Sequence, residues 1–69
     1  MDKQQAFKAL VSTLNDRTQN AEVRAGAARG LGHIGGPDAC AELAKAVNDR
    51  TQNAEVRTAA AEALGRAAG

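Results

Sequence analysis

The ten residues NDRTQNAEVR occur twice in the chain, at 15–24 and again at 48–57. At a shift of 33 positions, the distance from one copy to the other, further residues also match. These pairs include Leu10 with Leu43, Leu31 with Leu64 and Gly32 with Gly65. A period of this length is typical of a helical solenoid built from stacked helix pairs. The register predicts a single domain over 1–69, with repeats at 4–36 and 37–69.

Each repeat contains two apolar stripes with helical spacing. The first stripes are Phe7, Leu10, Val11 and Leu14 in repeat one and Cys40, Leu43, Ala44 and Val47 in repeat two. The second stripes are Val23, Ala27, Leu31 and Ile34, and then Val56, Ala60, Leu64 and Ala67. With one Phe and no Trp or Tyr, the core must be rich in Ala, which favours helix. The sequence predicts an all-α fold with helices at about 4–14, 21–34, 37–47 and 54–67.

Residues that begin and end helices lie at the expected boundaries. Asn20 and Asn53 each precede a second helix, where an Asn side chain can accept a hydrogen bond from a free backbone N–H. Between the repeats, Gly35 and Gly36 can take the left-handed backbone that ends a helix, and Pro37 suits a first turn. The sequence therefore predicts a short α-solenoid of two helix-turn-helix repeats.

The two second helices, AEVRAGAARGLGHIG and AEVRTAAAEALGRAAG, resemble the HEAT-like repeats of the phycobilisome-lyase type. The matching positions are Val23, Arg24, Ala27, Ala28, Leu31 and Gly32, and likewise Val56, Arg57, Ala60, Ala61, Leu64 and Gly65. The resemblance implies a solenoid of helix pairs, with a loop inside NDRTQN somewhat longer than that type usually has. Such a motif is specific for fold and says little about function.

Composition and charge exclude several classes of function. The formal net charge is +1 and no basic cluster is present, so a nucleic-acid partner is not expected. No apolar run reaches the length of a membrane span, and a membrane partner is not expected either. A single cysteine, Cys40, rules out an internal disulfide and fits a reducing compartment. We expect a soluble, cytoplasmic protein.

No set of residues in the sequence predicts catalysis, a cofactor or a metal. GLGHIG, at 30–35, fits the dinucleotide fingerprint formally, but it lies at a helix end rather than between a strand and a helix. Gly26, Gly30, Gly32 and Gly65 are better explained by close helix packing. His33 has no neighbouring ligand residues, and Cys40 takes the stripe position of Phe7, so we expect it to be a small buried hydrophobe. We therefore predict that the chain is not an enzyme.

Protein binding or scaffolding is the function that remains. The expected contacts are Arg17, Gln19, Arg50 and Gln52 in the NDRTQN loops and Arg29, Glu62 and Arg66 on the second helices. Identical loops have two explanations: recent duplication or construction from one unit, or a loop face that binds a partner twice. The alternatives for the whole chain are a fragment or engineered unit of a longer solenoid, or an accessory subunit of a bilin-lyase-like enzyme.

Self-association is also expected, because solenoids normally need at least three repeats and polar end caps. Neither end of this chain has the composition of a cap. The first helix carries the candidate self-association residues Phe7, Leu10, Val11 and Leu14. A closed homodimer is the favoured arrangement, with helix exchange about 35–37 or head-to-tail stacking as alternatives.

Overall fold

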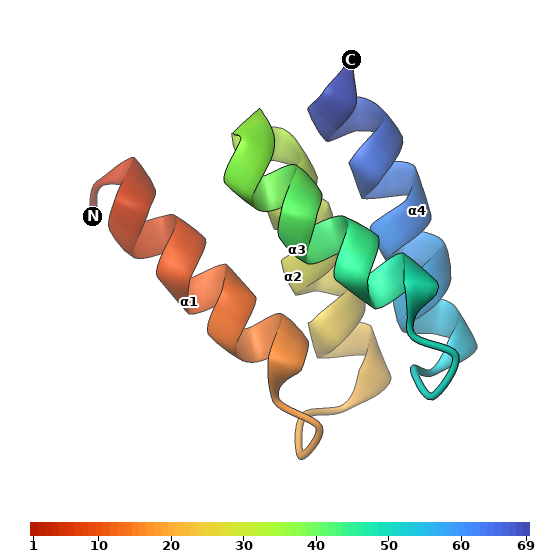
Figure 1. Cartoon of the computed structure of the whole chain (residues 1–69). Coiled ribbons are helices and arrows are strands. Elements are labelled where there is room, and N and C mark those ends of the chain that lie inside the picture. Colours follow the sequence, from red (N-terminus) through yellow and green to blue (C-terminus); the bar gives the residue numbers. More distant parts are fainter.

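The computed structural model describes residues 1–69 as four helices without a strand (Figure 1). The helices are α1 (Lys3–Asn15), α2 (Ala21–Ile34), α3 (Gly36–Asn48) and α4 (Ala54–Ala68). The all-α prediction is confirmed, and each predicted helix end lies within one residue of the observed one. Apolar positions at helical spacing, together with the asparagine and glycine signals at the boundaries, therefore located all four helices.

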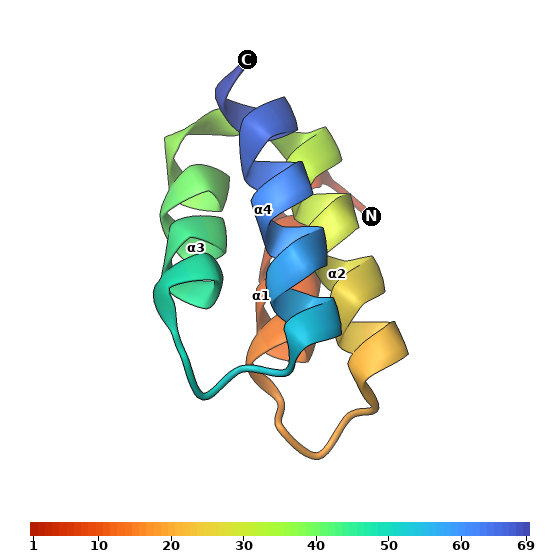
Figure 2. The ribbon, with the colours of Figure 1, turned by 90° about the vertical axis from the view of Figure 1, so that its right-hand side faces the viewer.

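The helices form two hairpins that stack side by side. Within each repeat the helices run antiparallel, α1 against α2 and α3 against α4 (Figure 1). Between repeats, α2 lies against α4 and runs in the same direction, as both views show (Figure 2). The molecule is flat, with extents of 29 × 24 × 14 Å. Stacking of α4 on α2 thus forms most of the interface between the repeats.

Side-chain caps begin the helices as predicted for α2 and α4. The Asn20 side chain accepts hydrogen bonds from the backbone N–H groups of Glu22 and Val23, and Asn53 accepts one from Glu55. The α1 helix has a capping box that the sequence prediction missed, formed by Asp2 and Gln5.

The joint between the repeats depends on two glycines. Gly35 and Gly36 have positive φ angles of 71° and 85°, in the region that favours glycine. Gly35 ends α2 and precedes α3, whose first turn contains Pro37. The predicted turn is confirmed.

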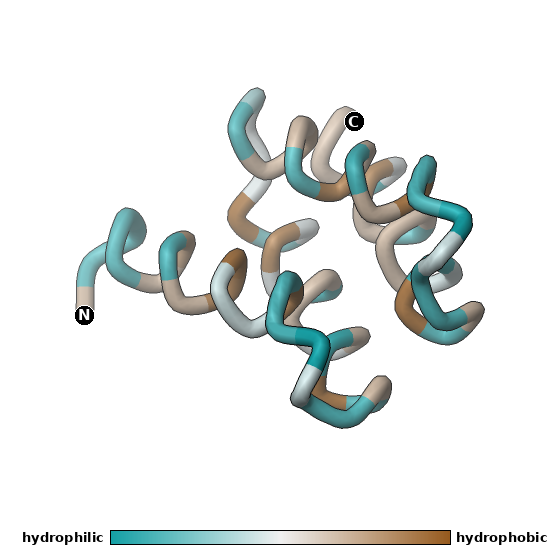
Figure 3. Tube along the Cα trace, turned by 60° about the horizontal axis from the view of Figure 1, so that its bottom comes forward, coloured by the Kyte–Doolittle hydropathy of each residue, from teal (hydrophilic) through white to brown (hydrophobic).

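The core is small and consists mainly of alanine methyl groups. Its largest fully buried side chains are Leu14, Leu31, Leu43 and Val56. The remaining core residues are Ala25, Ala27, Ala28, Ala39, Ala46, Ala59, Ala60 and Ala63. The two NDRTQN loops are hydrophilic and are largely teal in Figure 3. Short side chains permit the close approach of α2 and α4 that this core needs.

Glycine supports that close approach at one site in particular. A Cβ atom added at Gly32 would lie 2.8 Å from the Cβ of Ala63 on α4. Gly30 is also tightly packed, against a side chain of α1. A Cβ at Gly65 or Gly26 would meet nothing within 4 Å, so the prediction of close packing is wrong for these two positions within a single chain.

Two other predictions about the core need correction. Val23 was expected in the buried stripe, but it is 48% exposed, whereas its equivalent Val56 is fully buried. Val56 is covered because repeat one lies beside it, and no repeat lies beside Val23. Cys40 was expected to be buried, but it is only partly buried and its thiol is free.

Candidate functional site

The two NDRTQN loops lie at the same edge of the molecule and share one internal structure (Figure 1). In the first, the Asp16 carboxylate accepts hydrogen bonds from the backbone N–H and the hydroxyl of Thr18, at 3.0 and 2.6 Å. In the second, Asp49 accepts the same two bonds from Thr51, at 2.9 and 2.6 Å. These hydroxyl and N–H groups hold the pKa of both carboxyls below the usual aspartate value. Each loop therefore presents an ionised carboxylate in a fixed orientation.

Arg17 connects the first loop to the second. Its Nη2 atom donates to Asp49 Oδ2 at 2.7 Å and to Thr51 Oγ1 at 3.2 Å. Its Nη1 atom donates to the Thr51 carbonyl oxygen at 3.4 Å. The contact combines an ion pair with hydrogen bonds to the next loop, and so it fixes how the two loops lie relative to each other.

Arg24 makes a second connection, from the first turn of α2. Its side chain is 4% exposed, and its Nε and Nη2 atoms donate to the carbonyl oxygen of Leu14 at 2.9 and 2.7 Å. Because the last carbonyls of a helix lack partners within the helix, this guanidinium caps the C-terminal end of α1. Nη2 also donates to Gln52 Oε1 in the second loop at 2.7 Å. Arg24 thus stabilises its own helix hairpin and the junction between the repeats.

The equivalent groups at the two ends of the chain lack these inter-repeat partners. Arg57 repeats the helix cap, with Nε and Nη2 donating to the Val47 carbonyl at 3.1 and 3.0 Å, but it reaches no glutamine. Arg50, the equivalent of Arg17, is exposed and makes no hydrogen bond through its side chain. In the first loop, no basic side chain is paired with Asp16, and no side chain donates to the amide oxygen of Gln19.

On the helices too, some positions are buried in one repeat while their equivalents in the other repeat are exposed. Ala25 and Ala28 on α2 are fully buried, but their equivalents on α4, Thr58 and Ala61, are exposed. On α2 these positions face repeat two, and nothing within residues 1–69 covers their equivalents on α4. We define the C-terminal face as Arg50, Arg57, Thr58, Ala61 and Gly65.

The opposite side of the molecule shows the reverse pattern. Val56 and Ala59 on α4 are fully buried, but their equivalents Val23 and Gly26 on α2 are exposed. On α4 these positions face repeat one, and nothing within residues 1–69 covers their equivalents on α2. We define the N-terminal face as Asp16, Thr18, Gln19, Val23 and Gly26.

The predicted contact residues therefore fall into three groups. Arg17 and Gln52 are engaged inside the chain, in the junction between the repeats. Arg50 and Gln19 belong to the two unpartnered faces. Arg29, Glu62 and Arg66 are exposed on the outer surface of α2 and α4, where Arg66 Nη1 lies 3.5 Å from His33 Nε2.

Sequence reasoning missed the loop roles of Asp16 and Asp49. The available signal was the exact repetition of charged residues in a loop. Such repetition is expected when neighbouring loops contact each other.

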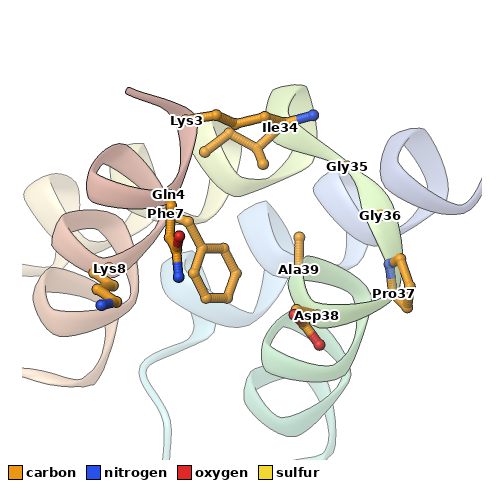
Figure 4. Close-up of a pocket in the computed structure, with 10 residues that line it drawn as sticks. All are labelled: Lys3, Gln4, Phe7, Lys8, Ile34, Gly35, Gly36, Pro37, Asp38 and Ala39. Atoms are coloured by element: carbon orange, nitrogen blue, oxygen red, sulfur yellow. The ribbon is translucent and has the colours of Figure 1, made fainter. Parts of the chain in front are cut away.

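The candidate self-association residues of α1 are partly used by the core. Leu14 is fully buried, so it offers no surface to another chain. Phe7, Leu10 and Val11 are partly buried against the core. The Phe7 ring lies in an open groove between α1 and the Gly35–Gly36 joint (Figure 4). The groove has a volume of about 390 Å³ and is lined by Lys3, Gln4, Phe7, Lys8, Ile34, Gly35, Gly36, Pro37, Asp38 and Ala39.

No group of three His, Cys, Asp or Glu side chains is placed to hold a metal ion. None of the helices combines the length and the apolar character that a membrane crossing requires.

Stacked helix pairs with a periodic sequence define an α-solenoid of the repeat-protein class. The family model for HEAT repeats matches residues 1–68, and the chain belongs to the HEAT-repeat family. Comparison with curated proteins and with solved structures gives no match. The HEAT-like prediction is confirmed, and the narrower phycobilisome-lyase type stays a prediction.

Proposed function

We propose that this chain is a non-enzymatic protein-interaction or scaffolding module that self-associates and acts in the cytoplasm. HEAT repeats commonly serve as protein-interaction scaffolds, which supports the general class. The observation that carries the proposal is the exposure of Val23 at 48% where its equivalent Val56 is fully buried. A surface of the kind that packs inside the chain is thus open at one end.

The chemistry of the open faces suits a protein rather than a nucleic acid. Each face combines small or apolar helix positions with a few polar loop groups, as protein interfaces do. The charged loop groups differ in sign, with Arg50 on the C-terminal face and Asp16 on the N-terminal face. A phosphate backbone would instead require a continuous basic surface.

Sedimentation equilibrium over about a hundredfold range of protein concentration tests self-association, with thermal unfolding measured at the same concentrations. We expect the average mass to rise above the 7.1 kDa of one chain and the melting temperature to rise with it. A folded 7.1 kDa species throughout, with a constant melting temperature, would contradict the proposal.

A unit taken from a longer solenoid is the second candidate, because the same open faces would then contact neighbouring repeats of one polypeptide. Sequencing the flanking reading frame distinguishes this case. For the bilin-lyase alternative, the chain is incubated with a linear tetrapyrrole and examined by absorbance and native mass spectrometry. Stoichiometric retention of the pigment would replace the scaffold proposal with an enzyme-related one.

A further inference from the structure

We infer that the C-terminal face of one copy docks on the N-terminal face of a second copy, head to tail, and reproduces the junction found inside the chain. The inference rests on the proposed self-association and specifies its geometry. Its basis is that the polar loop groups of the internal junction have equivalents at the two ends of the molecule, and that these equivalents lack the inter-repeat partners.

The loops supply the polar half of this contact. Arg17 binds Asp49 and Thr51 inside the chain, and the equivalent contact joins Arg50 of one copy to Asp16 and Thr18 of the next. Asp16 uses Oδ1 for both bonds to Thr18 and forms no ion pair, whereas the equivalent Asp49 accepts from Arg17 through Oδ2. The Asp16 carboxylate is thus already oriented for an arginine.

The buried arginines supply a second polar contact. Arg24 donates to Gln52 while capping α1, and Arg57 is held in the same way at the end of α3. The glutamine equivalent to Gln52 is Gln19, on the N-terminal face. Docking would place the Arg57 guanidinium of one copy against Gln19 of the next.

The helices supply the apolar half. Inside the chain Ala63 packs over Gly32, and the equivalent contact sets Gly30 of the second copy, with the Leu10 side chain packed against it, over Gly65 of the first. Space around Gly65 is open, with nothing within 4 Å of an added Cβ. The substitutions between the repeats are compatible with this contact. Thr58 is larger than its equivalent Ala25, and Gly26 is smaller than its equivalent Ala59.

Charge favours this order of faces over a closed dimer. A two-fold axis pairs each face with the same face of the other copy, so Arg50 of one copy would not meet Asp16 of the other. Head-to-tail contact brings the opposite charges together, and like charges across an interface are unfavourable. The closed homodimer expected from the sequence therefore becomes an outcome that the test must distinguish.

Two single variants block one face each. Val23→Lys places a charge on the N-terminal face, and Arg50→Glu reverses the charge on the C-terminal face. Both positions are exposed in the single chain, so both variants should keep wild-type helicity by circular dichroism. Arg29→Glu, a matched charge reversal on the outer surface of α2 and outside both faces, is the control.

Sedimentation equilibrium and native mass spectrometry then compare the variants alone and mixed. We expect each blocked variant to associate about tenfold more weakly than wild type or worse, while Arg29→Glu associates normally. The 1:1 mixture should form a heterodimer that grows no further, because only one compatible pair of faces remains. Raising the salt concentration should weaken wild-type association, since the loop contacts are exposed ion pairs.

The outcomes separate this inference from the proposed function. If wild type associates but the mixture forms no heterodimer, or if one variant still forms a stable homodimer, the head-to-tail geometry is overturned and self-association stands. Wild type that remains monomeric at all concentrations overturns both.

Discussion

Arg24 and Arg57 show how position in the stack, rather than residue type, determines what a side chain does. Both guanidinium groups cap the C-terminal end of the preceding helix through one carbonyl oxygen. Only Arg24 is covered by another repeat and reaches a glutamine across the junction. Because the sequence around the two arginines is identical, it could not reveal which of them would be buried.

Gly32 and Gly65 give a matched pair of substitutions. An alanine Cβ at position 32 would lie 2.8 Å from Ala63 Cβ and 2.9 Å from its Cα, so the α2–α4 contact must open. Such overpacking costs about 1–3 kcal/mol, against a gain in helix propensity of about 1 kcal/mol. We expect Gly32→Ala to lower the free energy of unfolding by roughly 1 kcal/mol on balance.

Gly65→Ala should do the opposite, because nothing lies near its added methyl group and the residue is helical. A gain of about 0.5–1 kcal/mol is expected. Urea unfolding followed by circular dichroism, at concentrations low enough to limit association, measures both. Equal effects of the two substitutions would show that α2 and α4 are not closely packed at Gly32.

The lowered pKa of Asp49 predicts how the stability of the fold changes at acid pH. The hydroxyl of Thr51, then its backbone N–H, and then Arg17 lower the pKa of Asp49 below the ordinary 3.8, while partial desolvation opposes them. A carboxyl with a lower pKa in the folded state contributes stability above its unfolded pKa and loses it as the pH falls through the folded value. Stability should thus be constant on approach from neutral pH and decline below about 3.8.

The Asp49→Asn variant should show a shallower decline over the same acid range, because its junction no longer depends on an ionised carboxylate. Asp16→Asn is the comparison, since Asp16 has the same loop bonds but forms no ion pair, and Arg24 acts on it only through its charge. Urea unfolding midpoints from pH 6 to pH 2.5 give the comparison. If the unfolding midpoint of Asp49→Asn falls with pH as steeply as that of the wild type, the Asp49 carboxylate does not contribute to the stability of the fold.

The helices were predictable from sequence because several kinds of local signal agree along the chain. Apolar spacing located the stripes, asparagines marked the beginnings of α2 and α4, and the paired glycines marked the joint. The Asp2 capping box of α1 was missed, although Asp2 followed by Gln5 is an acceptable form of that motif. A single sequence thus contains the signals that predict where helices begin and end, including the one that was missed.

The asparagine caps can be tested directly. Asn20→Ala removes an acceptor for two backbone N–H groups of α2, and Asn53→Ala removes the acceptor for Glu55 on α4. Each substitution should reduce the free energy of unfolding by about 1 kcal/mol, while Asn→Asp at either site should be nearly neutral. Thermal and urea unfolding check the values. Arg29→Ala changes an exposed residue that caps no helix. If the asparagine substitutions lower the free energy of unfolding no more than Arg29→Ala does, the caps do not stabilise the helices.

At the scale of the whole molecule, each repeat depends on the other for its buried surface. Arg24, Ala25 and Ala28 are covered only because repeat two lies beside them, and Val56 and Ala59 only because repeat one does. This dependence explains why the sequence predicted the fold but misplaced Val23. Helical spacing indicates which side of a helix is apolar, but it does not indicate which apolar position has a neighbour.

Separated repeats should therefore fail to fold. Peptides covering 1–35 and 36–69 are expected to show weak helicity alone, because short helices are marginal in water without tertiary packing. An equimolar mixture should show more helix than the sum of the two, since the α2–α4 contact can re-form. Far-ultraviolet circular dichroism makes the comparison. Strong helicity in either peptide alone would mean that one hairpin is stable by itself.

The candidate site was harder to predict than the fold. Arg17 and Gln52 were named as contacts for a partner, and the structure shows them in contact with the other repeat. Loop residues of this kind have no periodicity, so which groups meet depends on how the hairpins stack. Only the identity of the two loops indicated that they matter. The junction, in which one loop contacts the next, explains this identity in part.

The junction also affects whether in-frame duplication of a repeat gives a longer chain that folds. Because the loop carries both the donating arginine and the accepting aspartate, a unit copied in frame meets its neighbours through side chains that are already compatible. Duplicating residues 15–47 should give a longer soluble chain whose added helices fold, with no compensating substitution. Helicity per residue below that of the present chain would show that the two copies have already diverged too far to be interchangeable.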